Sequence, residues 1–194
     1  MVIRGGIDLV EDLARKIKAV AFDVDGVVTD NTFFEKKVKT RSYYDGQGVS
    51  LLRAIGIKVA FVTNTKGESA QMIESAVSQW NNLPSSRKPG NENGWEHIAL
   101  FLGFSGEGKV RAIEDWLIKN QLTWDLCAAM GDDLVDIPLL KRAVLRAAPV
   151  TAEEVVKSIC HFVSDRPGGY GALRDFVNFI LKIRGIDPTT LPPH

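Results

Sequence analysis

The sequence has few of the features that mark secreted, metal-thiolate or membrane-spanning proteins. Its only cysteines, Cys127 and Cys160, lie far apart in apolar segments and form no C-x-x-C pair. We therefore expect two buried free thiols rather than a disulfide framework or a cysteine metal site. No stretch of eighteen consecutive apolar residues occurs, and residues 1–9 contain no apolar run of signal length. Neither a transmembrane span nor a signal peptide is predicted, and we expect a soluble, cytoplasmic protein.

The chain also lacks an excess of charge of either sign. Its 24 Lys and Arg residues balance 24 Asp and Glu residues. No overall field would attract nucleic acid or an anionic membrane, so neither is expected as a partner, and any recognition of phosphate must be local. The 194 residues, 45% of them hydrophobic, suffice for one folded core, because domains typically contain roughly 100–200 residues. We expect a single domain over residues 1–194.

What the sequence does contain is an apolar segment that runs directly into acidic residues. Residues 18–30 read KAVAFDVDGVVTD, which is typical of a buried strand that delivers carboxylates to its C-terminal end. Open α/β sheets bind their ligands at that end. Since side chains alternate along a strand, Asp23 and Asp25 are expected on the same side. There they would lie close enough to share a cation or to divide the roles of nucleophile and acid.

Strand and helix patterns alternate along the rest of the chain. This alternation predicts an α/β fold with a doubly wound, mainly parallel sheet covered by helices. Thr151 and Glu154 fit a capping box at the start of a helix over 151–159. The other predicted features are a small β-hairpin flap at about 31–44, a chain break at 45–48 before a helix at 49–55, buried strands at 57–62 and 124–130, a loop at about 81–94, and a C-terminal tail at about 185–194.

Reactive side chains follow the predicted strands and one glycine-rich loop. Thr63 follows the strand at 57–62, Asp132 and Asp133 follow the strand at 124–130, and Lys109 begins a helix after the loop. In a doubly wound sheet these groups converge with the first pair of acids on one crevice. Carboxylates packed so closely need a balancing charge, which Mg²⁺ and a phosphate group would supply together.

With a magnesium ion and a phosphate bound, each of these groups has a chemical use. Asp23 would attack phosphorus in line, while Thr63 and Lys109 would hold the remaining phosphoryl oxygens. Asp25 would protonate the leaving alcohol and then deprotonate the water that cleaves the aspartyl-phosphate. The pattern therefore favours a phosphomonoesterase.

Each residue also has an interpretation that involves no catalysis. The D-x-D-G string resembles the start of a calcium loop, but apolar residues occupy the positions where such a loop needs oxygen ligands and glycine. An ordinary Asx-turn after the strand is another possible interpretation of this string. Taken alone, Thr63 is more often a helix N-cap, Lys109 a solvated lysine, and Asp132 and Asp133 caps of the following helix. Their order along the chain favours a shared site.

Together, the motifs resemble the signature of the haloacid dehalogenase superfamily of phosphatases. They are D-x-D-G-V-x-T-D at 23–30, Thr63, Lys109 and G-D-D-x-x-D at 131–136. With the strings DGQG at 45–48 and GGYGALR at 168–174, they look like the 3-deoxy-D-manno-octulosonate 8-phosphate phosphatase branch. That branch includes nonulosonate 9-phosphate phosphatases and domains attached to sialic-acid cytidylyltransferases. The resemblance extends over nearly the whole chain.

The resemblance implies a Rossmann-like fold without a cap domain and a role for each motif residue. Asp23 would be the nucleophile and a Mg²⁺ ligand, Asp25 the acid/base and a backbone-carbonyl ligand, and Asp132 the third ligand. The residues implied to contact phosphate or substrate are Thr63, Asn64, Lys109 and Gly46, with Asp133 and Asp136 in support. The implied substrate is a small phosphorylated sugar acid of the 3-deoxy-octulosonate 8-phosphate or nonulosonate 9-phosphate type. A homotetramer is expected, in which a neighbouring hairpin or tail closes the site.

The chain departs from that branch in two places. The branch usually has Thr-Gly-Arg or a close variant at the second motif, whereas this chain has Thr63-Asn64-Thr65. This change affects the part of the motif that helps to read the sugar acid and leaves the phosphoryl chemistry untouched. The segment at 81–94 is an apparent insertion, with possible effects on access or assembly.

Two other functions are open at this point. Gly103 to Lys109 satisfies most of a P-loop pattern, although Val110 stands where Ser or Thr should bind Mg²⁺. That interpretation leaves the acids at 23 and 25 without a role. The second alternative is a catalytically idle domain that serves assembly or regulation, as in the domains attached to cytidylyltransferases. The presence of both acids argues against it.

Overall fold

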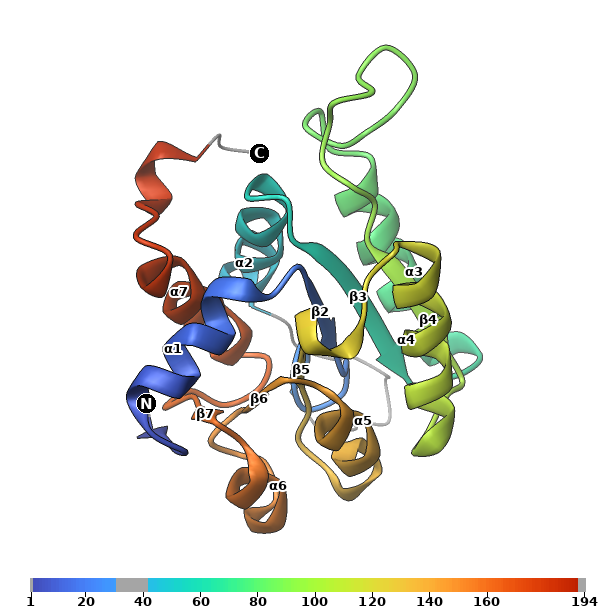
Figure 1. Ribbon diagram of the computed structural model, residues 1–194. Coiled ribbons are helices and arrows are strands. Elements are labelled where there is room, and N and C mark those ends of the chain that lie inside the picture. The colour runs from blue at the N-terminus through green and yellow to red at the C-terminus, as the bar shows by residue number, and fades with distance from the viewer. Residues whose placement is uncertain (1, 31–41, 192–194) are drawn as a thin grey trace.

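A seven-stranded sheet forms the centre of the molecule (Figure 1). The computed structural model describes residues 2–30 and 42–191. The strand order is β1-β7-β6-β5-β2-β3-β4, and every described pairing is parallel except that between β1 and β7. The predicted α/β class is confirmed. The strands are β1 Val2–Ile3, β2 Ala19–Phe22, β3 Lys58–Thr63, β4 Ala99–Leu102, β5 Cys127–Met130, β6 Leu145–Ala148 and β7 Phe162–Val163.

Helices cover both faces of the sheet, and the alternation of side chains along β2 shows how. Val20 and Phe22 join a core with apolar residues of α1, α2, α3 and α7. Ala19 and Ala21 face the other way, into a core shared with α4, α5 and α6. The helices are α1 Ile7–Lys16, α2 Tyr43–Ala54, α3 Glu68–Asn81, α4 Glu107–Lys119, α5 Ile137–Arg142, α6 Glu154–Ile159 and α7 Ala172–Ile183. None of the helices within the described residues is long and apolar enough to cross a membrane.

Three adjacent parallel strands end at the same edge of the sheet and so bring their following residues together. Phe22 at the end of β2 is in register with Met130 at the end of β5 and with Phe61 of β3. The backbone N–H of Asp23 continues this ladder by donating to the Met130 carbonyl at 2.9 Å. The residues that follow β2, β3 and β5 therefore form the candidate site.

The predicted break at 45–48 is wrong, because these residues lie inside α2. Ser42 caps this helix by accepting a hydrogen bond from the Tyr44 N–H at 3.1 Å. Two glycines lie on faces that pack closely: a Cβ at Gly48 would lie 3.1 Å from Leu173, and one at Gly46 would lie 3.2 Å from Trp80. Packing thus overrides the low helix propensity of glycine. Tyr43 and Tyr44 are also helical, and residues 31–41 of the predicted hairpin lie outside the described residues.

Asp45, in the first turn of α2, binds the start of α7 across the core. Its Oδ2 accepts from the Gly171 N–H at 3.0 Å and its Oδ1 from the Arg174 N–H at 2.9 Å. Burial raises the pKa of Asp45 to about 6, against the opposing effect of these two hydrogen bonds. A carboxylate 126 residues away in sequence thus satisfies backbone donors at the start of α7 that have no partner within the helix.

This raised pKa predicts how stability depends on pH. The folded state holds the Asp45 proton more tightly than the unfolded state, so the free energy of unfolding should fall as pH rises from about 4 through about 6. Asp45→Asn should remove this contribution. The free energy of unfolding of wild type minus that of the variant should therefore decrease by about 1–3 kcal/mol as pH rises over that range. Urea unfolding at several pH values measures the difference. Asp12→Asn on the exposed face of α1 is the control, and a pH-independent difference for Asp45→Asn would contradict the prediction.

The segment that follows α3 is held at the amino-terminal end of the sheet, away from the candidate site. The guanidinium of Arg53 is buried and donates to the Trp80 and Glu96 carbonyls, both at 2.9 Å, and to Ser86 Oγ at 2.8 Å. Glu96 also pairs with Lys58, the first residue of β3, at 3.4 Å. Figure 1 shows this loop projecting beyond the end of the sheet where β3 begins. Within one chain the apparent insertion therefore cannot cover the site at the opposite edge.

The predicted capping box at Thr151 is also wrong. α6 begins at Glu154, and neither Thr151 nor Glu153 caps it with a side chain. The Thr151 hydroxyl instead accepts from the Gly168 N–H at 3.4 Å. Strand β1 was not predicted either, because two residues are too few to produce a hydrophobic pattern.

Candidate active site

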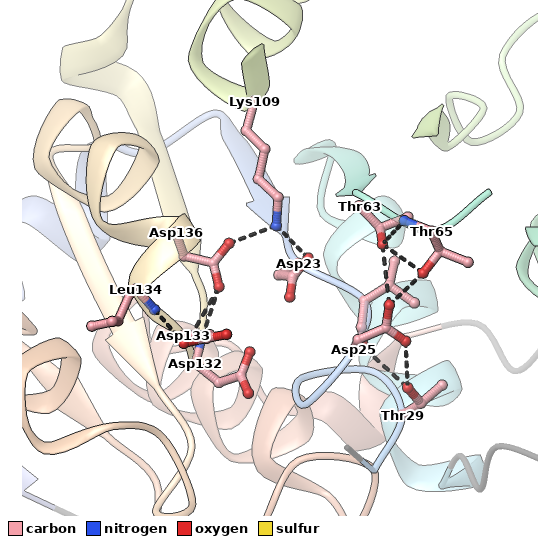
Figure 2. Close-up of polar contacts among 11 residues, drawn as sticks. Asp23, Asp25, Thr29, Thr63, Thr65, Lys109, Asp132, Asp133, Leu134 and Asp136 are labelled. Atoms are coloured by element: carbon pink, nitrogen blue, oxygen red, sulfur yellow. Dashed lines mark hydrogen bonds and ion pairs between the residues drawn. The ribbon is translucent and has the colours of Figure 1, made fainter. Parts of the chain in front are cut away.

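A buried lysine lies between two buried carboxylates at the carboxyl-terminal edge of the sheet (Figure 2). Lys109 Nζ, from the first turn of α4, is 2.6 Å from Asp23 Oδ1 and 2.6 Å from Asp136 Oδ1. Ligand oxygens of Asp23, Asp132 and Asp136 lie within 4.8 Å of one another. Residues 86 positions apart in sequence thus meet because α4 packs against β3, the neighbour of β2, and against α5, which follows β5.

The charges in this cluster are only partly balanced. Burial, followed by the charge of Asp136, raises the pKa of Asp23 well above its usual value, although Lys109 opposes the rise. Burial and the charges of Asp136 and Asp133 raise the pKa of Asp132 to about 7. Burial favours a lower pKa for Lys109, but the two carboxylates outweigh it and raise the pKa. One ammonium among three acids leaves negative charge that favours a further cation.

Asp136 has both carboxylate oxygens engaged. Oδ1 accepts from Lys109, and Oδ2 accepts from the backbone N–H groups of Asp132 at 3.1 Å and Asp133 at 3.3 Å. Asp133 caps the short 3₁₀ turn Leu134–Asp136, accepting from the Leu134 N–H at 2.6 Å. Asp136 thus fixes the backbone at Asp132 and orients Lys109, which leaves Asp23 and Asp132 as the acids of the cluster best placed to bind an ion.

The position opposite Asp132 accepts only glycine. Gly26 has a φ of +82°, and a Cβ there would lie 1.9 Å from Asp132 Oδ2. The backbone of the turn after β2 therefore lies directly against this carboxylate. Clustered carboxylate oxygens are ligands that hard divalent cations prefer, so the residues present fit such a metal.

Gly26→Ala should disrupt this arrangement. The methyl group needs space that the Asp132 carboxylate occupies, and the positive φ adds strain for any residue with a side chain. We expect metal affinity, measured by titration calorimetry with Mg²⁺ and Mn²⁺, to fall by about 10–100-fold. Gly56→Ala is a matched control, because Gly56 also has positive φ (78°) but no neighbour within 4 Å of a Cβ. Equal affinities in the two variants would contradict the role assigned to Gly26.

Asp25 faces three threonines, as Figure 2 shows. Its Oδ2 accepts from Thr63 Oγ1 at 3.3 Å and from Thr65 Oγ1 in a short hydrogen bond, while Oδ1 accepts from Thr29 Oγ1 at 3.5 Å. Alternation along the strand predicted that Asp25 would share the side of Asp23. β2 ends at Phe22, so Asp25 belongs to the following turn, where alternation no longer applies. Its carboxylate is not among the side chains of the acidic cluster.

A cavity of about 430 Å³ opens beside these threonines. Thr29 and Thr65 lie on one side of it and α3 forms much of the rest, through polar side chains such as Gln71 and Gln79. Met72 also lines the cavity and is exposed. A small polar molecule in this space would contact Thr29 and Thr65, the threonines that bind Asp25.

The structure brings together most of the predicted site residues, but not all of them. Thr63 contacts Asp25 as described, whereas the Asn64 side chain is exposed. Gly46 lies in α2 against Trp80, and no described contact links it to the acids. Sequence reasoning missed the contacts of Thr29 and Thr65 with Asp25. Thr65 carried a usable signal, since it lies two residues after Thr63 at a strand end.

Known proteins share this architecture. No family model matches the chain. The 3-deoxy-D-manno-octulosonate 8-phosphate phosphatase of Salmonella typhi is 27% identical over 176 residues, which cover 89% of this chain and 83% of that protein. A solved structure of a probable YrbI family phosphatase from Pseudomonas syringae pv. phaseolica is 30% identical, with a TM-score of 0.76 and 92% of each chain covered. The chain belongs to the haloacid dehalogenase superfamily of phosphatases.

A further relative shares the fold of this haloacid dehalogenase phosphatase. The 3-deoxy-D-manno-octulosonate 8-phosphate phosphatase of Moraxella catarrhalis, solved with a magnesium ion, a phosphate ion and KDO, is 22% identical. Its TM-score is 0.77, with 93% of this chain and 94% of that chain covered.

The relatives are named phosphatases, and this decides between the interpretations that the sequence left open. The protein is a hydrolase of phosphate monoesters, like its relatives. The P-loop interpretation also conflicts with the geometry, because Lys109 is buried and its ammonium binds two carboxylates. The interpretation as a catalytically idle domain is not supported either, because the acids at the strand ends are present and clustered.

Proposed function

We propose that this protein is a Mg²⁺-dependent phosphomonoesterase that acts on a small phosphorylated sugar acid through an aspartyl-phosphate intermediate. The observation that carries the proposal is the Asp23 carboxylate, buried at the end of the central strand and held by Lys109 at 2.6 Å. Asp25 follows two residues later, beside a cavity large enough for a small polar molecule. In this proposal the whole chain acts as one domain.

Asp23 is the proposed nucleophile. Lys109 binds its Oδ1, so we assign the attack on phosphorus to Oδ2. The ammonium of Lys109 also lies where it would offset charge on the phosphoryl oxygens as the bond to the leaving group breaks. Thr63 Oγ1 is the proposed donor to one of these oxygens.

Asp25 is the proposed acid and base. In the first step the Asp23–phosphorus bond forms, the bond from phosphorus to the leaving oxygen breaks, and the Asp25 proton passes to that oxygen. In the second step water attacks phosphorus and its proton passes to Asp25. Inorganic phosphate then leaves, and the Asp23 carboxylate is restored.

The proposed magnesium ligands are the side chains of Asp23 and Asp132 and the backbone carbonyl of Asp25. The fit of Gly26 against Asp132 and the residual negative charge of the cluster support this assignment. When bound, the ion supplies positive charge that offsets the repulsion between the nucleophile and the phosphate. Asp136 would support the site by fixing the backbone of Asp132 and the orientation of Lys109.

The proposed substrate is of the 3-deoxy-octulosonate 8-phosphate or nonulosonate 9-phosphate type. The names of the relatives support this class, as does the KDO bound to the Moraxella catarrhalis protein. Polar side chains among the lining residues, such as Gln71 and Gln79, suit the hydroxyl groups of a sugar. Thr65, where the branch usually has arginine, is the position at which we expect the preference between these sugar acids to differ.

The test is phosphate release from a panel of octulosonate, nonulosonate, hexose and nucleotide monophosphates, with and without Mg²⁺. We expect magnesium-dependent release with a preference for one sugar acid phosphate. A preference for hexose or nucleotide phosphates would contradict the substrate class while leaving the chemistry intact. Absence of release from every compound by folded protein would contradict the proposed activity.

The homotetramer implied by the family resemblance is also proposed. Tyr43 and Tyr44 at the start of α2 are 94% and 64% exposed, and Met72 at the cavity is 43% exposed. Exposed large apolar side chains of this kind support burial against another copy of the chain. Light scattering coupled to size exclusion tests the assembly, and a monomer at micromolar concentration would contradict it.

A further inference from the structure

The hydroxyl groups of Thr63 and Thr65 compete for the same carboxylate oxygen. Both lie within hydrogen-bond distance of Asp25 Oδ2, and the contact from Thr65 is the shorter of the two. The two hydroxyl oxygens lie 3.1 Å apart, and the Thr65 backbone N–H donates to Thr63 Oγ1 at 3.0 Å. The three side chains therefore form one connected network (Figure 2).

The number of hydroxyl hydrogens determines which acceptor each threonine can serve. Each hydroxyl has one hydrogen to donate. The Thr65 hydroxyl accepts from Thr63 and donates its own hydrogen to Asp25 Oδ2. The Thr63 oxygen is already oriented by the backbone N–H of Thr65. The single hydrogen of Thr63 is then donated to Thr65 Oγ1 at 3.1 Å, so the two hydroxyls form a hydrogen-bonded chain that ends on Asp25.

We propose that Thr65 is a positioning residue that holds the Asp25 carboxylate for proton transfer. The inference rests on the proposed function, because it assumes that Asp25 is the acid. Thr65 also lines the cavity beside Asp25. It therefore sets the position of the acid at the place where a leaving group would lie.

The step that Thr65 affects is the first one. In that step Asp23 bonds to phosphorus, the leaving oxygen departs with the bonding electron pair, and the Asp25 proton passes to it. A poor leaving group depends on this proton, whereas a good leaving group departs as an anion without it. Loss of a contact that positions Asp25 should therefore lower the rate for a substrate with a poor leaving group more than for one with a good leaving group.

The experiment compares phenyl phosphate with p-nitrophenyl phosphate, whose leaving group is far better. Both are aryl phosphates, so the comparison does not depend on which sugar acid the enzyme prefers. The variants are Thr65→Val, which removes the hydroxyl at almost constant shape, and Thr65→Ser, which keeps it. The parameter is kcat/KM, because it reports the first chemical step and not the later hydrolysis of the aspartyl-phosphate. Thermal unfolding checks that each variant folds.

We expect Thr65→Val to lower kcat/KM for phenyl phosphate by about tenfold, corresponding to loss of one hydrogen bond to a charged group, and for p-nitrophenyl phosphate by less than about threefold. Thr65→Ser should restore both values. If Thr65 had a merely structural role, Thr65→Val would lower kcat/KM for both substrates by the same factor. That result, or an unchanged kcat/KM for both substrates, would overturn the inference.

Asp25→Asn separates failure of the inference from failure of the proposed function. If Asp25 is the acid, this variant should lose more activity on phenyl phosphate than on p-nitrophenyl phosphate, and adding Thr65→Val to it should cause no further selective loss. Selective loss in Asp25→Asn without selective loss in Thr65→Val overturns only the role of Thr65. Equal losses on both substrates in Asp25→Asn overturn the acid role and the inference with it.

Discussion

Asp23→Asn should abolish turnover while the fold survives. The amide is nearly isosteric with the carboxylate but is a far weaker nucleophile, and no aspartyl-phosphate can form from it. We expect kcat to fall on the order of 10⁴-fold or more, as for the loss of other covalent nucleophiles. Phosphate release with saturating Mg²⁺ is the measurement. Normal activity in the variant would show that Asp23 is not the nucleophile.

The stability of this variant should differ little from that of wild type. Burial and the charge of Asp136 already disfavour the ionised form of Asp23, so a neutral side chain removes an unfavourable charge. Lys109 keeps its second partner, Asp136, at 2.6 Å. We expect the free energy of unfolding to fall by no more than about 1 kcal/mol. The exposed Asp115→Asn controls for the general effect of removing one carboxylate.

Lys109→Met should have the largest effect on stability. Methionine has a similar length but no charge, so Asp23 and Asp136 would lose the ammonium that lies 2.6 Å from each of them. Removing one partner of a buried ion pair typically costs about 3–5 kcal/mol. For a chain of this size that corresponds to a decrease in melting temperature of about 10 °C or more. Activity should also be lost, because Lys109 orients the nucleophile.

A second substitution tests the electrostatic cause of that loss. Lys109→Met combined with Asp136→Asn removes one of the unbalanced charges and keeps an oxygen to accept from the Asp132 and Asp133 N–H groups. The double variant should be more stable than Lys109→Met alone, although still inactive. Lys119→Met, on an exposed position of the same helix, is the matched control. If the double variant is no more stable, lost packing and not charge explains the effect of Lys109→Met.

The sheet and the main residues of the candidate site were predictable because their signals are local. The central strands are short apolar runs. Asp23 directly follows β2, Thr63 ends β3, and Asp132 lies two residues after β5. Parallel strands must place these residues at one edge of the sheet. Lys109 required a longer inference, since only the packing of α4 brings it into contact with Asp23.

The orientation of Asp25 and the extent of α2 were not predictable, because tertiary contacts determine both. Asp25 lies just beyond the strand, so the turn and three threonines decide where its carboxylate points. In α2, Asp45 and two glycines favour a break by their intrinsic propensities. The helix forms because its glycines allow close packing and its aspartate binds the N–H groups of α7.

The turn that presses Gly26 against Asp132 is itself covered by a loop from much later in the chain. A Cβ at Gly168 would lie 1.7 Å from the Gly26 carbonyl oxygen, and the Gly169 N–H donates to the Val27 carbonyl at 3.0 Å. During synthesis on the ribosome, the first motif therefore emerges long before its cover does. Proteins are made at about 5–20 residues per second. Several seconds therefore pass between synthesis of the turn at Gly26 and synthesis of the loop at Gly168 that covers it. The active site is consequently among the last parts of the molecule to reach its final form, and a ribosome-bound chain that stops short of Gly168, which lacks both this loop and α7, should have no activity.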